Sequence, residues 1–452
     1  MHHIVILGLL ASCVYTTAVA APRAWCLFET DNVSLHTNHR PTDAVALMKG
    51  LAALRAYAEP LLPPRATPSH RVSIVALRSS RAFRRLFGQS HATGLLLPTI
   101  GASTIVLGAD PDALTGVGFH EYIHYLQRLH AHEALPPWLD EGTATLLSRL
   151  RFEPHAHWAR PPFTGTLPPA RVVAINALSE LAPEDLPAFY NSAQRLAAWA
   201  LFRADATQRA SLLAPVPADG RLRPTIAVLA RRAYADSPRR LPDPVIGAVP
   251  DDPPTLVRCL DATASKLLLA EPLAALNPSR VAQHLDGIET TAADVLRSRA
   301  AEILGDGRLA VTLAQRASAA GDVAGTVQLA LLQLSDCLAD RPACTADWQA
   351  HALVLRRLIQ THPDNYPAVY GLGLAFLFGG QPGDARRYLQ VAYRHAPWSP
   401  RVNYFLGEAL RLTGDGEAVR YLTNALTWAE TGAWRARAES ALALAAATPD
   451  TG

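Results

Sequence analysis

The strongest constraint on the fold is an internal repeat near the C-terminal end of the chain. Residues 368–397 align with residues 401–426 at an offset of 34 positions, which becomes 33 in the second half of the unit. The identical pairs are Gly373 with Gly407, Ala375 with Ala409, Ala385 with Ala418, Tyr388 with Tyr421, Leu389 with Leu422 and Ala392 with Ala425. A period of this length is typical of a helix pair that must stack on neighbouring pairs to bury its apolar face.

Both units resemble the tetratricopeptide repeat, in which small residues lie where paired helices approach closely. The positions that carry the resemblance are Leu372, Gly373, Ala385, Leu389, Ala392 and Pro397. Residues 308–334 form a third, weaker unit. Because such arrays need about three units to bury a core, we expect residues 256–450 to form one all-α, tetratricopeptide-like solenoid. Whether its surface binds a protein partner or only packs against itself stays open.

The first half of the chain mixes strand and helix patterns. A long helical pattern covers residues 42–58, and the pattern after residue 108 is helical. Strand-like runs occur at residues 32–38, 72–77 and 103–108. From Asp236 to Thr255 proline and charge accumulate, which suits neither a helix nor a central strand. We therefore expect an α+β domain at residues 21–235, a proline-rich linker at 236–255 and the helical domain beyond it.

The N-terminal segment predicts export. Residues 1–20 are apolar from Ile4 onward and end in Ala18-Val19-Ala20, the small residues of a secretory cleavage site. We expect a signal peptide at 1–20 and a periplasmic or secreted protein. Leu10-Ala11-Ser12-Cys13 also resembles a bacterial lipoprotein box, so the alternative is a lipid anchor on Cys13, the one route by which we expect a membrane contact. No later segment has the about 18 uninterrupted apolar residues that a spanning helix needs.

Charge and cysteine content limit the remaining classes. The formal net charge is +3 with 18% charged residues, which lacks the basic footprint that nucleic-acid binding requires. If Cys13 leaves with the signal, Cys26, Cys259, Cys337 and Cys344 remain, an even number in an oxidising compartment. We expect Cys337 to pair with Cys344, and the alternative is four free buried thiols.

The motif His120-Glu121-x-x-His124 predicts a metal site on a helix. Residues four apart on an α-helix differ by about 40° in azimuth, so two imidazoles can bind one ion with Glu121 beside them. Phe119, Ile123 and Leu126 form the apolar stripe that would bury this helix. A catalytic zinc ion needs a third protein ligand and an open position.

Two residues compete for the third position. His130 has the spacing of the metzincin motif, but Gln127 occupies the place where that motif needs a glycine to break the helix. Metzincins also need a downstream methionine, and Met1 and Met48 both lie upstream. The other candidate is Glu141, which follows the proline break at Pro136 and Pro137 and could return on an antiparallel second helix.

The combination of HEYIH with the segment WLDEGTA (138–144) resembles the gluzincin metallopeptidases, specifically the peptidase MA-like group. The resemblance covers roughly Trp25 to Tyr234, including the helix at 189–193, and implies a zincin-like fold. By this resemblance His120, His124 and Glu141 would bind Zn²⁺, and Glu121 would act as the general base that activates water for peptide hydrolysis. The expected partner is therefore a peptide or protein substrate.

The roles of the remaining polar residues are less constrained. The resemblance suggests Tyr190 as the donor to the oxyanion, with His155 and His157 as alternatives and half-buried packing as the other interpretation of Tyr190. Asp140 could orient an imidazole or lie in solvent at the start of its helix. Residues 103–108 could be the edge strand that binds substrate or an ordinary internal strand. His130, His132 and Glu133 are expected at a solvated helix end.

A different class of function is also compatible with the sequence. The repeats could belong to a cell-envelope scaffold or adaptor whose zinc site is structural or inactive. Glu121 argues against this alternative, because a structural site would fill its fourth position and has no use for an unligated carboxylate.

Overall fold

The computed structural model describes most of the chain. The described residues are 24–64, 71–88, 93–100, 102–130, 135–152, 155–160, 165–175, 178–213, 224–238, 240–247, 249, 252–339, 347–428 and 432–447. The predicted signal peptide with Cys13 lies outside them, as do His132 and Glu133. The predicted pairing of Cys337 with Cys344 also lies outside, because residues 340–346 and the side chain of Cys337 are not described.

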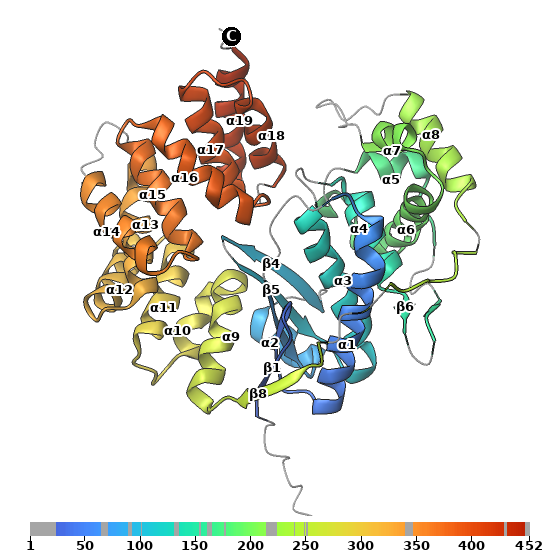
Figure 1. Cartoon of the computed structure of the whole chain (residues 1–452), viewed down its shortest axis with the longest axis horizontal. Coiled ribbons are helices and arrows are strands. Elements are labelled where there is room, and N and C mark those ends of the chain that lie inside the picture. The colour runs from blue at the N-terminus through green and yellow to red at the C-terminus, as the bar shows by residue number, and fades with distance from the viewer. Residues whose placement is uncertain are drawn as a thin grey trace, which may run out of the picture.

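The first part of the chain is built on a mixed sheet. Its strands run in the order β4-β5-β3-β2-β1-β8, and β6 pairs with β7 in a separate hairpin (Figure 1). The strands are β1 Cys26–Glu29, β2 Val33–Thr37, β3 Val72–Leu77, β4 Gly94–Thr99, β5 Ala102–Gly108, β6 Leu150–Arg151, β7 His157–Trp158 and β8 Thr255–Cys259. The pairs β2–β3 and β3–β5 are parallel, whereas β4, β1 and β8 join by antiparallel pairing.

Helices of this part cover the sheet and extend beyond it. They are α1 Pro41–Ala58, α2 Ser80–Phe87, α3 Pro111–His130, α4 Pro137–Leu147, α5 Pro169–Ala174, α6 Leu186–Phe202, α7 Ala206–Leu213 and α8 Pro224–Ala235. The strands predicted at 32–38 and 72–77 and the helix predicted at 42–58 are confirmed within a residue or two at each end. The strand predicted at 103–108 is also present as β5, which lies between β4 and β3. Of its two expected roles, the internal strand is confirmed and the edge strand is wrong, because β4 occupies the edge.

The sheet is buried on both faces. Side chains alternate along a strand, so Ile74 and Ala76 of β3 enter the core beneath α1 and α3, while Val75 and Leu77 enter a second core with α2. This two-sided burial explains why β3 is an almost continuous apolar run rather than an alternating one. The second core also contains residues of α9 (Ala262–Leu276) and α11 (Thr291–Ile303), so the helices after the linker begin on the back of the sheet.

A disulfide links strand β8, just before α9, to strand β1 at the start of the described chain. Strand β8 pairs with β1, and the disulfide joins Cys26 to Cys259 across the pair, closing a loop with a sequence separation of 233. The expectation of helices from residue 256 onward misses β8, and the expected cysteine pairing misses this disulfide. A sheet contact of this kind has no local sequence signal, because a strand exposed on both faces shows no apolar alternation.

Beyond β8 the described chain consists of helices that pack in sequence order (Figure 1). They are α9, α10 Val281–His284, α11, α12 Gly307–Ala319, α13 Val323–Ala339, α14 Trp348–Thr361, α15 Tyr366–Phe378, α16 Pro382–His395, α17 Pro400–Leu412, α18 Ala418–Thr427 and α19 Gly432–Ala447. We call α9 to α19 the helical unit. The predicted repeats coincide with the pairs α15–α16 and α17–α18. The weaker unit at 308–334 coincides with α12–α13.

The repeat glycines explain why the two pairs share a pattern. A Cβ atom on Gly373 would lie 2.7 Å from Leu389 Cγ, and one on Gly407 would lie 2.7 Å from Leu422 Cγ. The same close approach therefore occurs at equivalent places in successive pairs. Among the described residues, no helix has the length and apolar character needed to cross a bilayer.

Candidate metal centre

Two imidazoles and one carboxylate converge at the junction of α3 and α4. His120 Nε2 lies 3.2 Å from His124 Nε2, and Glu141 Oε2 lies 3.3 Å and 3.5 Å from these two nitrogen atoms. The possible ligand atoms of all three residues lie within 4.8 Å of one another. Within the described part of the chain, no other group of three histidine, cysteine, aspartate or glutamate residues meets this condition.

Local sequence accounts for this convergence. Residues 120 and 124 share one face of α3, which continues without a break to His130. Pro137 begins α4 at its first helical position, and the turn from α3 to α4 brings residue 141 back toward residue 120. Gln127 fixes this return, because its buried side-chain amide donates to the carbonyl oxygens of Leu139 and Asp140.

The position of α4 depends on close backbone contact with α6. A Cβ atom on Gly142 would lie 2.5 Å from the carbonyl oxygen of Ala193, so only glycine fits at this crossing. Trp138 and Phe189 are both buried in the core that α4 shares with α6. Gly142, the residue next to Glu141, is therefore held against α6.

Asp140 orients one of the imidazoles. Its Oδ1 lies 3.0 Å from His124 Nδ1, and Arg128 contacts both carboxylate oxygens at 3.3 and 3.1 Å. When the ring is neutral, a donor bond from Nδ1 to the carboxylate leaves the lone pair on Nε2, which faces His120 and Glu141. The expectation that Asp140 could orient an imidazole is confirmed. The alternative of a solvated helix start is wrong, because the side chain is only 15% exposed and pairs with Arg128 and His124.

Arg128, which holds Asp140, also contacts the helical unit. The guanidinium of Arg128 lies 4.4 Å from the ring centroid of Trp428, at the end of α18. A cation over an aromatic face is stabilised by about 0.5–1 kcal/mol at a partly exposed site. No sequence pattern indicates this contact, because the two residues are 300 positions apart.

Replacing Arg128 by Ala is expected to lower the affinity for zinc by about 10–100-fold, the usual cost of losing a residue that orients a metal ligand. Asp140 would lose its charged partner and hold His124 less firmly. Competition with a fluorescent zinc chelator measures the change. Arg40→Ala is the matched control, since Arg40 lies at the surface, where it pairs with Asp43. Equal affinities for the two variants would contradict the role of Arg128.

Burial and neighbouring charges shift the pKa values of His124 and Glu141 in opposite directions. Burial alone would lower the pKa of His124, but the carboxylates of Asp140 and Glu141 outweigh it and raise the pKa well above 6.5. Burial would raise the pKa of Glu141, but the imidazoles of His124 and His120 outweigh it and lower the pKa to about 2. In the metal-free protein a proton on His124 therefore balances part of the negative charge of the two carboxylates.

Zinc binding is expected to release a proton from His124 and to strengthen as the pH rises. Below the raised pKa the metal-free ring is protonated, whereas a metal ligand must be neutral. Each pH unit below that pKa should weaken binding by up to about tenfold. Calorimetry in two buffers of different ionisation enthalpy would report the released proton. A binding enthalpy independent of the buffer near neutral pH would contradict the prediction.

Glu121 lies beside the three residues but faces the sheet edge. Its carboxylate is buried, and the backbone N–H of Leu96 on β4 hydrogen-bonds to it. Burial raises the pKa of Glu121, although His120 and His124 oppose the shift. A Cβ atom on Gly94 would lie 2.9 Å from Glu121 Oε1, so the glycine makes room for this carboxylate.

Tyr190 lies near the three converging residues without joining them. Its ring on α6 is 6.4 Å from the ring of His120. Burial, followed by the carboxylates of Glu141 and Glu121, raises the pKa of Tyr190 above its usual value of 10. The phenol therefore keeps its proton at neutral pH and can act as a hydrogen-bond donor.

The structure separates the other predicted residues from the centre. His130 is buried, with Nδ1 bonded to the carbonyl of Pro63, so the metzincin arrangement is excluded. The expectation that His130 lies at a solvated helix end is wrong for the same reason. His155 and His157 are exposed at the β6–β7 hairpin, where His157 Nδ1 bonds to the carbonyl of His155.

The centre is partly buried and partly accessible, because only His124 of the three residues is buried. The side chain of His120 is 23% exposed, compared with 9% for His124. A metal ion bound by the two Nε2 atoms and Glu141 would thus have protein on one side and access from the His120 side. Three protein donors and one accessible position suit a catalytic zinc site better than a structural one.

Comparisons with known proteins add little to this geometry. No family model matches the chain, and no curated protein matches it. Among solved structures, a thermophilic TPR protein from Thermus thermophilus matches with 21% identity and a TM-score of 0.34, covering 40% of this chain and 100% of that one. This similarity is weak.

Proposed function

We propose that this chain is a zinc-dependent hydrolase of peptide bonds, with His120, His124 and Glu141 as metal ligands. The observation that carries the proposal is the environment of Glu141 Oε2. This atom is buried and has no well-directed hydrogen-bond donor among the described residues, yet it lies within 3.5 Å of two ring nitrogens. A divalent cation would satisfy all three atoms at once, because imidazole nitrogen and carboxylate oxygen are common zinc donors.

The residues around this site suit hydrolysis. A zinc ion held there would supply Lewis acidity, polarising a carbonyl group and acidifying a water molecule. Glu121 is our candidate for the proton acceptor, since its carboxylate is close to the two imidazoles without being one of the three converging ligands. Burial raises its pKa above the usual value for a carboxyl group, which is the direction that suits a general base. Tyr190 is our candidate for the hydrogen-bond donor to a developing oxyanion, because its ring stacks edge-on near His120.

Strand β4 is a suitable place for an extended substrate. It is the sheet edge next to Glu121, and Pro98 within it removes one backbone N–H, which is tolerated at an edge. A peptide that pairs with β4 would place its backbone beside Glu121. This arrangement and the two-helix ligand set support the zincin-like, gluzincin-type assignment that the sequence suggests, with export to the periplasm or medium as its expected location.

The proposal is tested with zinc-loaded protein and a peptide library prepared from a denatured proteome. We expect cleavage detectable by mass spectrometry, lost with 1,10-phenanthroline and regained on adding zinc. The alternative, an envelope scaffold or adaptor with an inactive zinc site, predicts bound zinc without any cleavage. The contact between Trp428 and Arg128 supports this alternative, because it connects the helical unit to the residues around the candidate metal site.

A further inference from the structure

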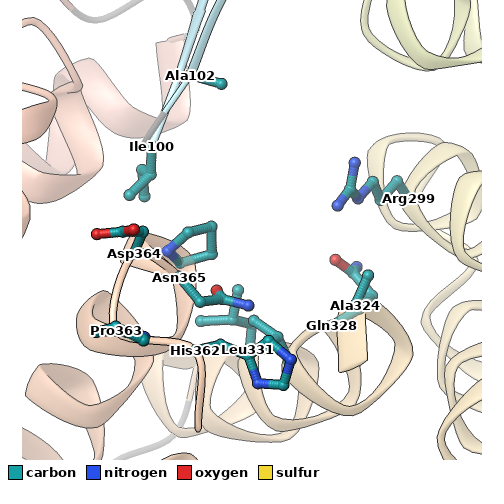
Figure 2. Close-up of a pocket in the computed structure, with 12 residues that line it drawn as sticks. Ile100, Ala102, Arg299, Ala324, Gln328, Leu331, His362, Pro363, Asp364 and Asn365 are labelled. Atoms are coloured by element: carbon teal, nitrogen blue, oxygen red, sulfur yellow. The ribbon is translucent and has the colours of Figure 1, made fainter. Parts of the chain in front are cut away.

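A pocket of about 520 Å³ lies where the turn between β4 and β5 meets the helical unit (Figure 2). Ile100 contributes from the turn and Ala102 from the start of β5. The remaining lining comes from α11, from α13, from the segment between α14 and α15 and from the first turn of α15, including Arg299, Gln328, His362, Asp364 and Asn365. The metal centre is not part of this pocket.

The pocket lies at the end of the strand that borders Glu121. Leu96 donates its backbone N–H to Glu121, and Ile100 is four residues further along the chain. At about 3.3 Å per residue, this part of β4 covers about 13 Å. A polypeptide running along β4 from Glu121 would therefore reach the pocket after about four residues.

The helical unit fixes both the pocket and the strand. Ile100 packs against the apolar core of α13 to α18, and Leu95 and Leu97 of β4 pack against the core that α9 and α11 share with the sheet. In Figure 1, β4 and β5 lie between α3 and the helical unit. The helical unit thus contacts the edge strand at its back and at its tip, so the pocket and the strand are adjacent parts of one surface.

The pocket offers groups that suit a peptide with an acidic side chain. Figure 2 shows Arg299 and Asn365 directed into the space. Arg299 is 41% exposed, and within the described part of the chain its one carboxylate partner is Glu271 at 3.9 Å. Asn365 uses its carbonyl oxygen to cap α15, and its amide nitrogen has no hydrogen-bond partner among the described residues. The carboxylate of Asp364 points away from Arg299 in Figure 2.

We propose that this pocket is a second substrate-binding site, which holds a segment of an extended polypeptide about four residues from the cleaved bond and pairs an acidic side chain with Arg299. The inference rests on the proposed hydrolase function. It implies that substrates are unfolded or extended chains rather than folded surfaces, because only an extended segment can pair with β4 and enter the pocket together.

The test uses nested truncations of a peptide that the wild-type protein cleaves, with about two or about six residues on each side of the cleaved bond and glutamate or lysine at the fourth or fifth position. The longer glutamate peptide should have a kcat/KM about tenfold higher than the short one, which is the contribution of one charge-assisted contact. This gain should occur for extension on one side of the cleaved bond and not for extension on the other side. Arg299→Glu should abolish this gain and instead favour the lysine peptide, while its rate with the short peptide stays unchanged.

Arg308→Glu is the matched control, since Arg308 is exposed on α12 and does not line the pocket. It should behave as the wild type with all peptides. Zinc content and circular dichroism of both variants should equal those of the wild type. Rates that depend neither on length nor on Arg299 would overturn the inference while leaving the hydrolase proposal intact. Failure of the wild type to cleave any peptide would instead overturn the hydrolase proposal.

Discussion

Replacing Glu121 by Gln is expected to lower kcat/KM for peptide cleavage by about 10³-fold, within the range attributed to a positioned general base. Glutamine has nearly the same shape and can keep its place beside Gly94 and the N–H of Leu96, but it cannot accept the proton. The zinc content should stay at one ion per chain, because Glu121 is not among the three converging ligands. Steady-state kinetics and metal analysis of the same preparation measure both quantities.

The comparison variant is Glu141→Gln, because Glu141 is a proposed metal ligand and Glu121 is not. Loss of activity with retained zinc should occur only in the Glu121→Gln variant. If Glu121→Gln cleaves peptides at the wild-type rate, the assignment of the base is wrong. If it loses zinc as well, Glu121 supports the ligands rather than the chemistry.

Replacing Gly142 by Ala is expected to destabilise the protein by about 3 kcal/mol, the upper part of the usual cost of overpacking. The added methyl group would meet the backbone carbonyl of Ala193 at 2.5 Å, and backbone atoms on two packed helices cannot move independently. Any shift that relieves the contact also moves Glu141, so the affinity for zinc should fall too. Chemical denaturation of the metal-free protein separates the effect on stability from the effect on metal binding.

The matched control for this variant is Gly116→Ala on α3. A Cβ atom there would meet only Arg151 Nη2, at an ordinary 3.6 Å. Because alanine is favoured over glycine inside a helix by up to about 1 kcal/mol, this control should be neutral or slightly stabilising. Equal stability of the Gly142→Ala and Gly116→Ala proteins would show that α4 and α6 are not in the close contact described here.

The convergence of His120, His124 and Glu141 could be predicted because its information is local. His120 and His124 share a helix face by spacing alone, and Pro136 and Pro137 force the chain to turn before Glu141. The repeats could be predicted for a similar reason, since a period of 34 residues makes each helix pair visible in the sequence of the next.

The features that the sequence did not reveal depend on long-range pairing. β4 includes Pro98 and the run Gly-Leu-Leu-Leu, which has no alternation because one face meets α3 and the other meets the helical unit. β8 and the disulfide from Cys26 to Cys259 require a partner more than two hundred residues away. The contact of Trp428 with Arg128 is of the same kind, because the two residues lie 300 positions apart in the sequence.

The most direct test of the metal centre is the zinc content of the purified wild-type protein beside its Glu141→Ala variant. We expect one zinc ion per wild-type chain, bound by two imidazole nitrogens and one carboxylate in X-ray absorption spectra, and loss of stoichiometric zinc from Glu141→Ala after dialysis. Wild-type protein that binds no zinc, or a Glu141→Ala variant that retains the full amount, would contradict the ligand assignment.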